Sequence, residues 1–303
     1  MEKINFPYRS ETHLPFLHVV GQSGAWEKHG LQVDYDKSIT SEDAHSKVAN
    51  GSVEFVGGNH VSPYGRRPKG DRWIYLAQTV NLLNHRIVTR PESGISKVSD
   101  LRGKKVASKG QHPSLNTWLF LKQNGLLADC TIERVRNNTA WEFARDGRAD
   151  AAFVTPPADL FARRAGLKVI EIEPLPMVWF TTVSTCLAFV EQHPDIVDKF
   201  LKGLCEGIAF FKTHRRESVK IIKDKYKEEG ELDDEAASHL YDKLTTVLQA
   251  KPYPTVPAIS NVYEIAQEQD KTAAQVDPLA LWDLHFLRRI DDSGFIDGLY
   301  RGL

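Results

Sequence analysis

Apolar and polar positions along the first two thirds of the chain predict short strands separated by amphipathic helices. Residues 31–35 alternate with a period of two, which is typical of a half-buried strand. Residues 14–28 carry apolar side chains along one helical face, and Gly30 is expected to end that helix. Strands separated by helices indicate an α/β fold with a largely parallel sheet. Further strands are predicted at 4–8, 55–56, 73–80, 85–89, 131–135, 151–154, 168–172 and 178–182.

From residue 194 onward the apolar spacing changes to that of helices. The long segment 196–214 has a continuous apolar face, and Pro252-Tyr253-Pro254 interrupts the helical pattern. Other helices are predicted at 218–226, 235–247, 261–269 and 279–290. The chain has 303 residues, which is too long for most single hydrophobic cores. We therefore expect two lobes with a helical C-terminal part.

Charge and cysteine content narrow the class of protein. The formal net charge is -1, and no broad basic surface is expected, so nucleic acid is an unsuitable partner. The three cysteines form no CxxC pair, which indicates reduced thiols rather than a disulfide framework. The first residues, Met1-Glu2-Lys3, lead into the first strand without an apolar signal region, and no segment is apolar enough to span a membrane. These features predict a cytoplasmic protein.

Three motifs resemble those of a known superfamily. Asp100-Leu101-Arg102-Gly103-Lys104-Lys105-Val106-Ala107 looks like the start of the second lobe in solute-binding proteins for nitrate, sulfonates and taurine. Gly30-Leu31-Gln32-Val33 and the segment 147–153 (GRADAAF) resemble two strand entries of the same proteins. The chain is thus similar to the type II periplasmic-binding-protein-like superfamily, which also includes thiamine-pyrimidine-synthase-like proteins.

The resemblance implies two lobes joined by two crossover strands, near residues 84–86 and 184–187. Lobe I would comprise residues 1–84 and 187–303, and lobe II residues 85–186. The ligand would lie in a cleft between them, at the carboxyl ends of strands and the N-termini of helices. Free backbone N–H groups and the helix dipole favour a small anion in such a place.

Four strand-to-helix loops are expected to face the ligand: residues 9–13, 57–60, 109–114 and 155–156. Each of the first three contains a histidine, namely His13, His60 and His112, which could donate or accept protons near neutral pH. Arg9 could hold a carboxylate or sulfinate by a bidentate contact. Each of these residues could equally be an ordinary polar loop residue. The other predicted ligand contacts are Glu11, Gly58, Asn59, His85, Gln111, Ser114, Thr155 and Trp179.

The sequence predicts no cofactor. His13, His60 and His112 could together hold a metal, but no HxH or HExxH spacing supports that site. One desulfinase of this fold uses a cysteine in the first loop, where this chain has Glu11-Thr12-His13. The cysteine-rich metal motif of the thiamine-pyrimidine synthases is also absent, so neither mechanism transfers.

Two functions remain open. The favoured interpretation is a cytoplasmic lyase that removes CO2 from a small, aromatic organic acid, with Arg9 holding a carboxylate and His60 or His112 protonating the carbon. The alternative is the solute-binding component of an ABC importer for a sulfonate, nitrate or similar anion. In both cases the partner is a small organic anion, and the sequence leaves homo-oligomer formation open.

Overall fold

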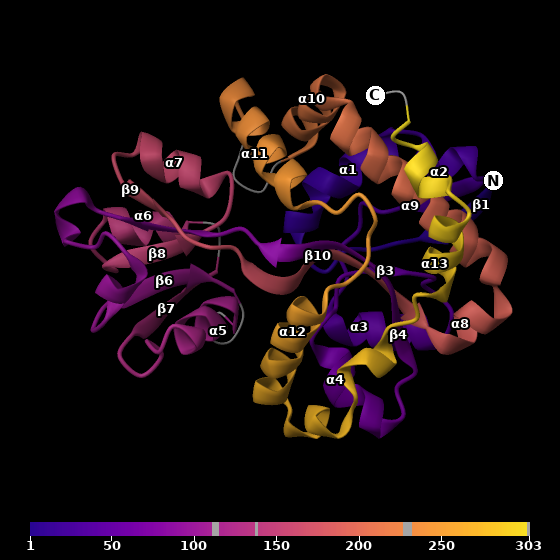
Figure 1. Cartoon of the computed structure of the whole chain (residues 1–303), viewed down its shortest axis with the longest axis horizontal. Helices are drawn as coiled ribbons and strands as arrows, with labels where there is room; N and C mark the ends of the chain where they lie inside the picture. The colour runs from indigo at the N-terminus through magenta and orange to yellow at the C-terminus, as the bar shows by residue number, and fades with distance from the viewer. Residues whose placement is uncertain (111–114, 137–138, 227–231, 302–303) are drawn as a thin grey trace. The chain divides into compact units, whose positions relative to one another are not determined.

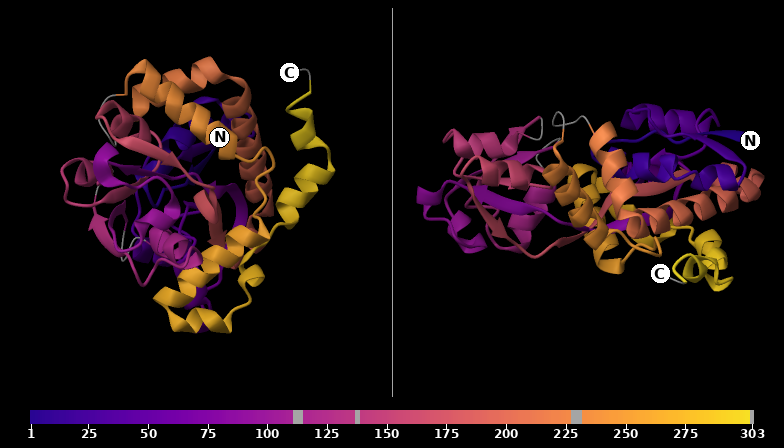
Figure 2. Two further views of the ribbon diagram at one scale, coloured as in Figure 1. Left: turned by 60° about the vertical axis from the view of Figure 1, so that its left-hand side comes forward. Right: turned by 90° about the horizontal axis from the view of Figure 1, so that it is seen from above.

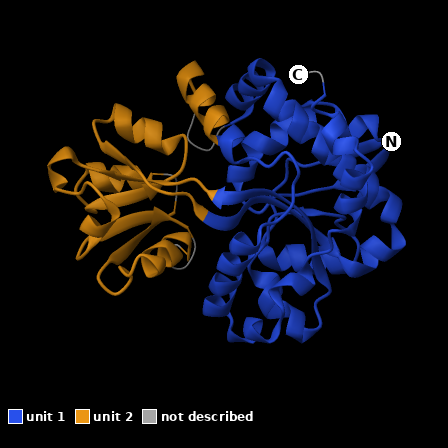
Figure 3. Ribbon diagram, in the orientation of Figure 1, with its two compact units in different colours: residues 1–82, 176–231, 244–303 blue, residues 83–175, 232–243 orange. Residues whose placement is uncertain are grey.

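The protein is an α/β structure made of two compact units. A computed structural model describes residues 1–110, 115–136, 139–226 and 232–301. Unit 1 contains residues 1–82, 176–231 and 244–303, and unit 2 contains residues 83–175 and 232–243 (Figure 3). The elements of each unit are labelled in Figure 1. The predicted α/β class is confirmed.

The units differ from the predicted lobes at residues 83–84, which belong to unit 2, and in two longer segments. Residues 176–186 belong to unit 1, because strand β10 (Leu175–Cys186) pairs there with β3 (Val56–Gly57). Residues 232–243 belong to unit 2, where His239 contacts Asp159 at 2.9 Å. Strand β4 (Trp73–Leu83) carries the chain out of unit 1, and β10 carries it back.

Two small sheets form the interior of unit 1. Strand β1 (Glu2–Asn5) pairs in parallel with β2 (Leu31–Asp34). A second sheet has the order β3-β10-β4, with β10 antiparallel to β3. Beyond β1 the chain runs beside β3, where the Gly57 N–H donates to the Pro7 carbonyl at 2.9 Å. The loop after Tyr8 and the loop after β3 are thereby brought together.

Helix α9 (Pro194–Thr213) is the central helix of unit 1, and it contacts α1 (Leu14–Gln22) and α2 (Ala25–Lys28) (Figures 1 and 2). The predicted single helix over 14–28 is wrong, because Gly24 takes the left-handed conformation at φ +73° and divides it. Aromatic rings fill the space beneath α9: Phe55 stacks on Phe200 at 4.1 Å, and the Trp26 indole N–H donates to the Phe200 carbonyl at 3.1 Å. This packing explains the apolar face that the sequence displays.

The predicted helix over 279–290 is interrupted. At Trp282 the backbone is extended and forms a bridge with Tyr75, and the Asp283 N–H donates to the Tyr75 carbonyl at 2.9 Å. Tertiary pairing thus overrides the helical pattern. The other helices outside unit 2 are α3 (Ser41–Ala49), α4 (Ser62–Arg66), α8 (Leu187–Gln192), α10 (Arg215–Lys225), α12 (Val256–Gln269), α13 (His285–Asp292) and α14 (Phe295–Gly298), and α11 (Asp234–Val247) begins in unit 2 and ends in unit 1. Short 3-10 turns occur at Glu11–His13, Arg67–Lys69, Pro91–Ser93, Val98–Leu101, Lys271–Gln275 and Pro278–Leu281.

Unit 2 is built on a five-stranded mixed sheet with the order β7-β6-β8-β5-β9. Strand β6 is parallel to β7 and β8, but β5 is antiparallel to both β8 and β9. Four of the five strands therefore run in the same direction, which agrees with the largely parallel sheet that the sequence predicts. Strand β5, which follows β4 in the chain, lies between β8 and β9 and runs opposite to both. The bounds are β5 (Arg86–Thr89), β6 (Lys105–Lys109), β7 (Thr131–Val135), β8 (Ala151–Val154) and β9 (Lys168–Glu171).

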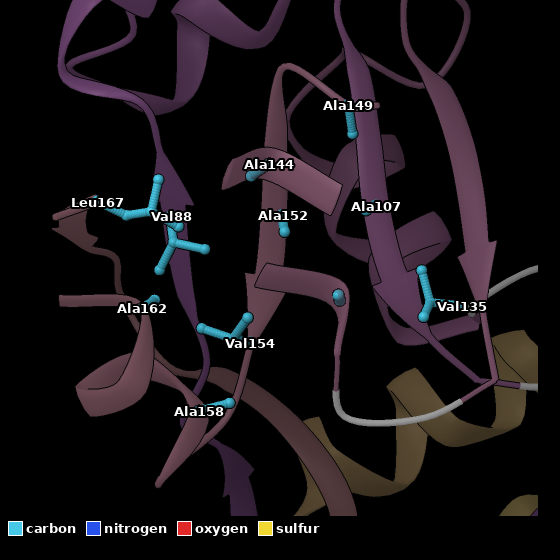
Figure 4. Packing of buried hydrophobic residues seen from close by; sticks show 11 residues of the cluster. Val88, Ala107, Val135, Ala144, Ala149, Ala152, Val154, Ala158, Ala162 and Leu167 are labelled. Carbon is cyan, nitrogen blue, oxygen red and sulfur yellow. The ribbon is translucent and has the colours of Figure 1, made fainter. Parts of the chain in front are cut away.

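Small side chains let the helices of unit 2 lie close to its sheet. The helices are α5 (Leu115–Gln123), α6 (Ala140–Arg145) and α7 (Ala158–Arg164). Alanines from α6, α7, β6 and β8 meet in one apolar cluster (Figure 4). Its buried members are Val88, Ala107, Val135, Ala140, Ala144, Ala149, Ala152, Val154, Ala158, Ala162 and Leu167.

Across the described ranges, every helix is too short or too polar to cross a bilayer.

The close approach of α9 and α1 yields a stability prediction at Gly207. A Cβ atom at this position would lie 2.4 Å from Val20 Cγ1, so Gly207→Ala must displace one helix. We expect a loss of about 1–3 kcal/mol in the free energy of unfolding, measured by urea denaturation, as for other overpacked cores. Gly298→Ala in α14 is the matched control, because a Cβ there meets no atom within 4 Å. Equal stability of the two variants would contradict this packing.

Candidate functional site

Two loops of unit 1 meet at the position where the sequence predicts ligand contacts. We call residues 9–13 loop A and residues 57–62 loop B. The Arg9 N–H donates to the Gly57 carbonyl at 3.0 Å, and the Gly58 N–H donates to the Thr182 carbonyl at 2.8 Å. Gly58 has φ +111°, and a Cβ there would lie 3.0 Å from Arg9 Cβ and 3.2 Å from His13 Cε1. Only glycine therefore allows the loops to approach this closely.

Arg9 places an uncompensated positive charge between the loops. Its Nη1 donates to the Ile39 carbonyl, but its Nε is buried without a hydrogen-bond partner. Within the described ranges, no carboxylate forms an ion pair with this guanidinium. Burial lowers the pKa of Arg9 from its ordinary value. A half-buried guanidinium with a free donor is a strong site for an anion, because the anion would supply the missing partner.

His13 and His60 flank this charge as neutral imidazoles. Burial first, then the charges of His60 and Arg9, lower the pKa of His13 to about 3. Burial first, then Arg9, lowers the pKa of His60 to about 4. His13 is enclosed, with its Nδ1 3.3 Å from the Thr181 hydroxyl, whereas His60 is partly exposed and its Nδ1 is buried without a partner. Both rings can therefore offer an N–H or a lone pair at neutral pH.

The backbone of loop B adds further donors. Asn59 has a left-handed conformation with φ +64°, which asparagine tolerates better than most residues. The backbone N–H groups of Asn59, His60 and Val61 donate no hydrogen bond to any acceptor among the described residues. Consecutive free N–H groups around a left-handed residue form an anion-binding concavity. Loop B thus reinforces the preference that Arg9 creates.

Strand β10 contributes aromatic side chains to this region. Phe180 stacks on His13 with ring centroids 5.8 Å apart, and its φ of +57° is an outlier for a bulky residue. Trp179 and Phe180 are both partly exposed, with rings 6.4 Å apart. Thr181, which contacts His13, has no signal in the sequence because it lies inside an apolar strand. Aromatic rings beside an anion site could contact the apolar part of an organic ligand.

The predicted site residues separate into four groups, three of which are the following. Arg9, His13, Gly58, Asn59 and His60 are brought together in unit 1. Glu11 is exposed on loop A, and Trp179 lies on β10, where its carbonyl accepts from Gln78 Nε2. The loop residues Gln111, His112 and Ser114 lie outside the described residues.

His85 and Thr155 belong to unit 2. His85 is buried beside Phe120 and Phe153, its Nε2 has no partner, and burial lowers its pKa to about 4. Thr155 follows β8, and its carbonyl accepts from the Ala158 N–H at 2.9 Å. Their contribution to ligand binding stays a prediction.

Among the described residues, His, Cys, Asp and Glu are the side chains that bear on metal and thiol chemistry. No group of three or more His, Cys, Asp or Glu residues there could hold a metal ion. Cys130, Cys186 and Cys205 form no disulfide. Burial raises the pKa of Cys205 to about 12, so its thiol stays protonated.

Comparison with known proteins gives a consistent assignment. The NMT1/THI5-like family model matches residues 12–218. A protein of Bacillus subtilis (strain 168), named for binding aliphatic sulfonates, is 29% identical over 208 residues. That match covers 66% of this chain and 62% of the relative, so the chain matches less than two thirds of the relative's length.

Solved structures show the same fold. The periplasmic aliphatic sulphonate binding protein SsuA of Escherichia coli matches with a TM-score of 0.71 and 15% identity, covering 93% of this chain and 99% of that one. DSZB in complex with biphenyl-2-sulfinic acid matches with a TM-score of 0.64 and 13% identity, covering 96% and 99%. At these identities the similarity concerns the fold alone. Because the family model matches more than half of the sequence, the chain belongs to the NMT1/THI5-like family of the type II periplasmic-binding-protein-like superfamily, as its motifs predict.

Proposed function

We propose that the protein binds a small organic anion, such as a sulfonate, through Arg9 and the free N–H groups of loop B. The observation that carries the proposal is the buried Arg9 Nε, which has no hydrogen-bond partner while no described carboxylate neutralises the guanidinium. Leaving such a group unpaired costs free energy, and an anionic ligand removes that cost. A sulfonate has three oxygens, which suit the guanidinium fork and backbone N–H donors together.

The relatives favour a solute-binding role over the lyase that the sequence ranks first. The Bacillus subtilis relative and the Escherichia coli SsuA are both named for sulfonate binding. Neutral His13 and His60 also suit binding, since each can donate a hydrogen bond to an anion. The proposal is therefore a binding component for an organic anion, with an ABC importer as the system it would serve.

Replacing Arg9 tests the anion site directly. We expect Arg9→Gln to weaken binding of ethanesulfonate or benzenesulfonate by roughly 10- to 100-fold, because a charged hydrogen bond contributes about 1.5–3 kcal/mol. Isothermal titration calorimetry measures the change. Arg289→Gln is the matched control, because Arg289 is exposed and pairs with Asp198 at 2.9 Å. If wild-type protein binds either sulfonate and Arg9→Gln binds it equally well, Arg9 is not the anion contact.

The depressed histidine pKa values predict that binding takes up protons. A negative charge about 4 Å from an imidazolium, at an effective dielectric constant of about 20, stabilises it by about 4 kcal/mol, or roughly three pKa units. The bound anion should thus raise the pKa of His60 from about 4 towards neutrality. Since the bound state then holds more protons, the affinity for benzenesulfonate should increase as the pH falls from 8 to 5.

Calorimetry at pH 6 in buffers of different ionisation enthalpy measures this proton uptake. His60→Asn is the control, because it keeps a polar side chain that does not titrate. Most of the pH dependence should disappear in this variant. An affinity that is flat between pH 5 and 8 in the wild type, without proton uptake, would contradict the position of His60 beside the anion.

A lyase remains the second candidate, and one observation favours it. His60 combines partial exposure with an unpartnered Nδ1 beside Arg9, and partly exposed aromatic residues lie on β10. Arg9 would hold the carboxylate of an aromatic acid, the bond to that carboxylate would break to release CO2, and His60 would protonate the carbon. Because His60 is neutral in the free protein, the bound carboxylate would have to raise its pKa first.

Turnover by a His60→Ala variant separates the two functions. For a general acid, we expect a loss of about 10²- to 10⁴-fold in CO2 release from a substrate such as a dihydroxybenzoate, with affinity within a few-fold of wild type. For a binding residue, affinity should fall by about 1–3 kcal/mol. Product analysis of the wild-type protein provides the reference. Binding of aromatic acids without any CO2 release would exclude the lyase for those acids.

A further inference from the structure

At the end of loop B, the side chains of a serine, a histidine and an aspartate of unit 1 lie next to one another in that order. His45 lies on α3, Ser62 begins α4, and Asp71 precedes β4. The Ser62 hydroxyl lies 2.9 Å from His45 Nε2, and Asp71 Oδ2 lies 2.6 Å from His45 Nδ1. These are the contacts that activate a serine: the imidazole faces the hydroxyl, and the carboxylate stabilises the imidazolium that forms.

The surroundings of His45 fix the orientation of its ring, and those of Asp71 keep its carboxylate ionised. His45 is 3% exposed and packs on the Trp73 ring at 4.7 Å, which holds the imidazole in place. Burial would raise the pKa of Asp71, but hydrogen bonding and charge from His45 outweigh it and keep the carboxylate ionised. The Nδ1–H is not yet aligned with Asp71 Oδ2, although the two atoms are close, which is common in ligand-free catalytic sites.

Loop B could supply the donors that stabilise an oxyanion. The N–H groups of Asn59, His60 and Val61 directly precede Ser62 and bond no acceptor in the described segments. Ser62 is partly exposed, so a substrate can reach its hydroxyl. Asn59 Oδ1 also lies 3.0 Å from the Ser62 hydroxyl and 2.8 Å from the Ser41 hydroxyl. Asn59 Nδ2 lies 3.2 Å from His45 Nε2, so to react Asn59 must release this nitrogen and Ser62 must turn its proton from Asn59 to His45.

We propose that Ser62, His45 and Asp71 form an acyl-transfer site for small esters. The Ser62 oxygen attacks the ester carbonyl while His45 Nε2 takes the hydroxyl proton. The resulting oxyanion collapses, the bond to the alcohol oxygen breaks, and His45 returns the proton to the leaving alcohol. Water, deprotonated by His45, then cleaves the acyl-serine to give the acid and free Ser62. Arg9 takes no part in this activity, but the oxyanion donors are the same loop B N–H groups that the proposed anion site uses.

The test uses the full chain, a fluorophosphonate probe and p-nitrophenyl acetate. Peptide mass spectrometry should find the probe on Ser62, and p-nitrophenol should be released in a burst. Ser62→Ala should lose both signals, and His45→Gln should slow labelling by at least roughly 100-fold. Ser46→Ala is the control, since Ser46 is exposed on the same helix as His45 and donates to the Asp43 carbonyl. Absence of label on Ser62, or equal labelling in His45→Gln, would overturn the proposal.

A cysteine variant provides an independent measurement. If Ser62 had only a structural role, the pKa of a thiol at this position would not depend on His45 or Asp71. In Ser62→Cys the thiol would lie beside His45, so its pKa should fall below about 8.5 and iodoacetamide should alkylate it rapidly at pH 6. Ser46→Cys should titrate near about 8.5. Asp71→Asn in the Ser62→Cys background should raise the thiol pKa again. Identical pH profiles for the two cysteines would overturn the proposal even if His45→Gln fails to fold.

Discussion

Backbone hydrogen bonds between residues 7–9 and Gly57 hold the candidate site together. The Gly57 N–H donates to Pro7, and the Arg9 N–H donates to Gly57, so the chain after β1 is tied to the end of β3. These bonds force Arg9 against Gly58, where only a missing side chain leaves room. The rest of the site depends on this contact, because it places Arg9 and His13 beside loop B, which carries the free backbone N–H groups.

Burial without a counter-charge gives this volume its chemical character. A buried arginine is normally paired with a carboxylate, and pairing would cancel its attraction for a ligand. Here Arg9 is held by a backbone carbonyl instead, and burial first, then the charge of Arg9, lowers the pKa of the neighbouring histidines so that they stay neutral. The site therefore has strong donors, one net positive charge and no competing acid in the described segments. An organic anion with several oxygens satisfies these donors better than water does.

Loop B takes part in two groups of polar residues, and the two groups have different partners. On one side, free N–H groups and His60 lie near Arg9. On the other, Asn59 and Ser62 are bonded to Ser41 and His45, and Asp71 closes the row. Buried polar atoms are normally satisfied, but His60 Nδ1 in loop B, Arg9 Nε in loop A and His45 Nδ1 on α3 have no hydrogen-bond partner. Loop B contacts both loop A and α3, and it thereby relates both proposals to the same segment of chain.

Most of the elements and most of the candidate residues near Arg9 could be predicted from the sequence alone. Local periodicity predicts β7 over 131–135 and β8 over 151–154 correctly, because strand alternation and turn residues are short-range signals. Loop positions after predicted strands also identify Arg9, Gly58, Asn59 and His60. Only the tertiary structure decided the reversed direction of β5, the break at Trp282, the Thr181 and Phe180 neighbours of His13, and the row from Ser62 to Asp71. Those features join residues far apart in the sequence, such as His13 and Thr181, which are 168 positions apart, and no pattern within one segment encodes which distant segment will pack against it.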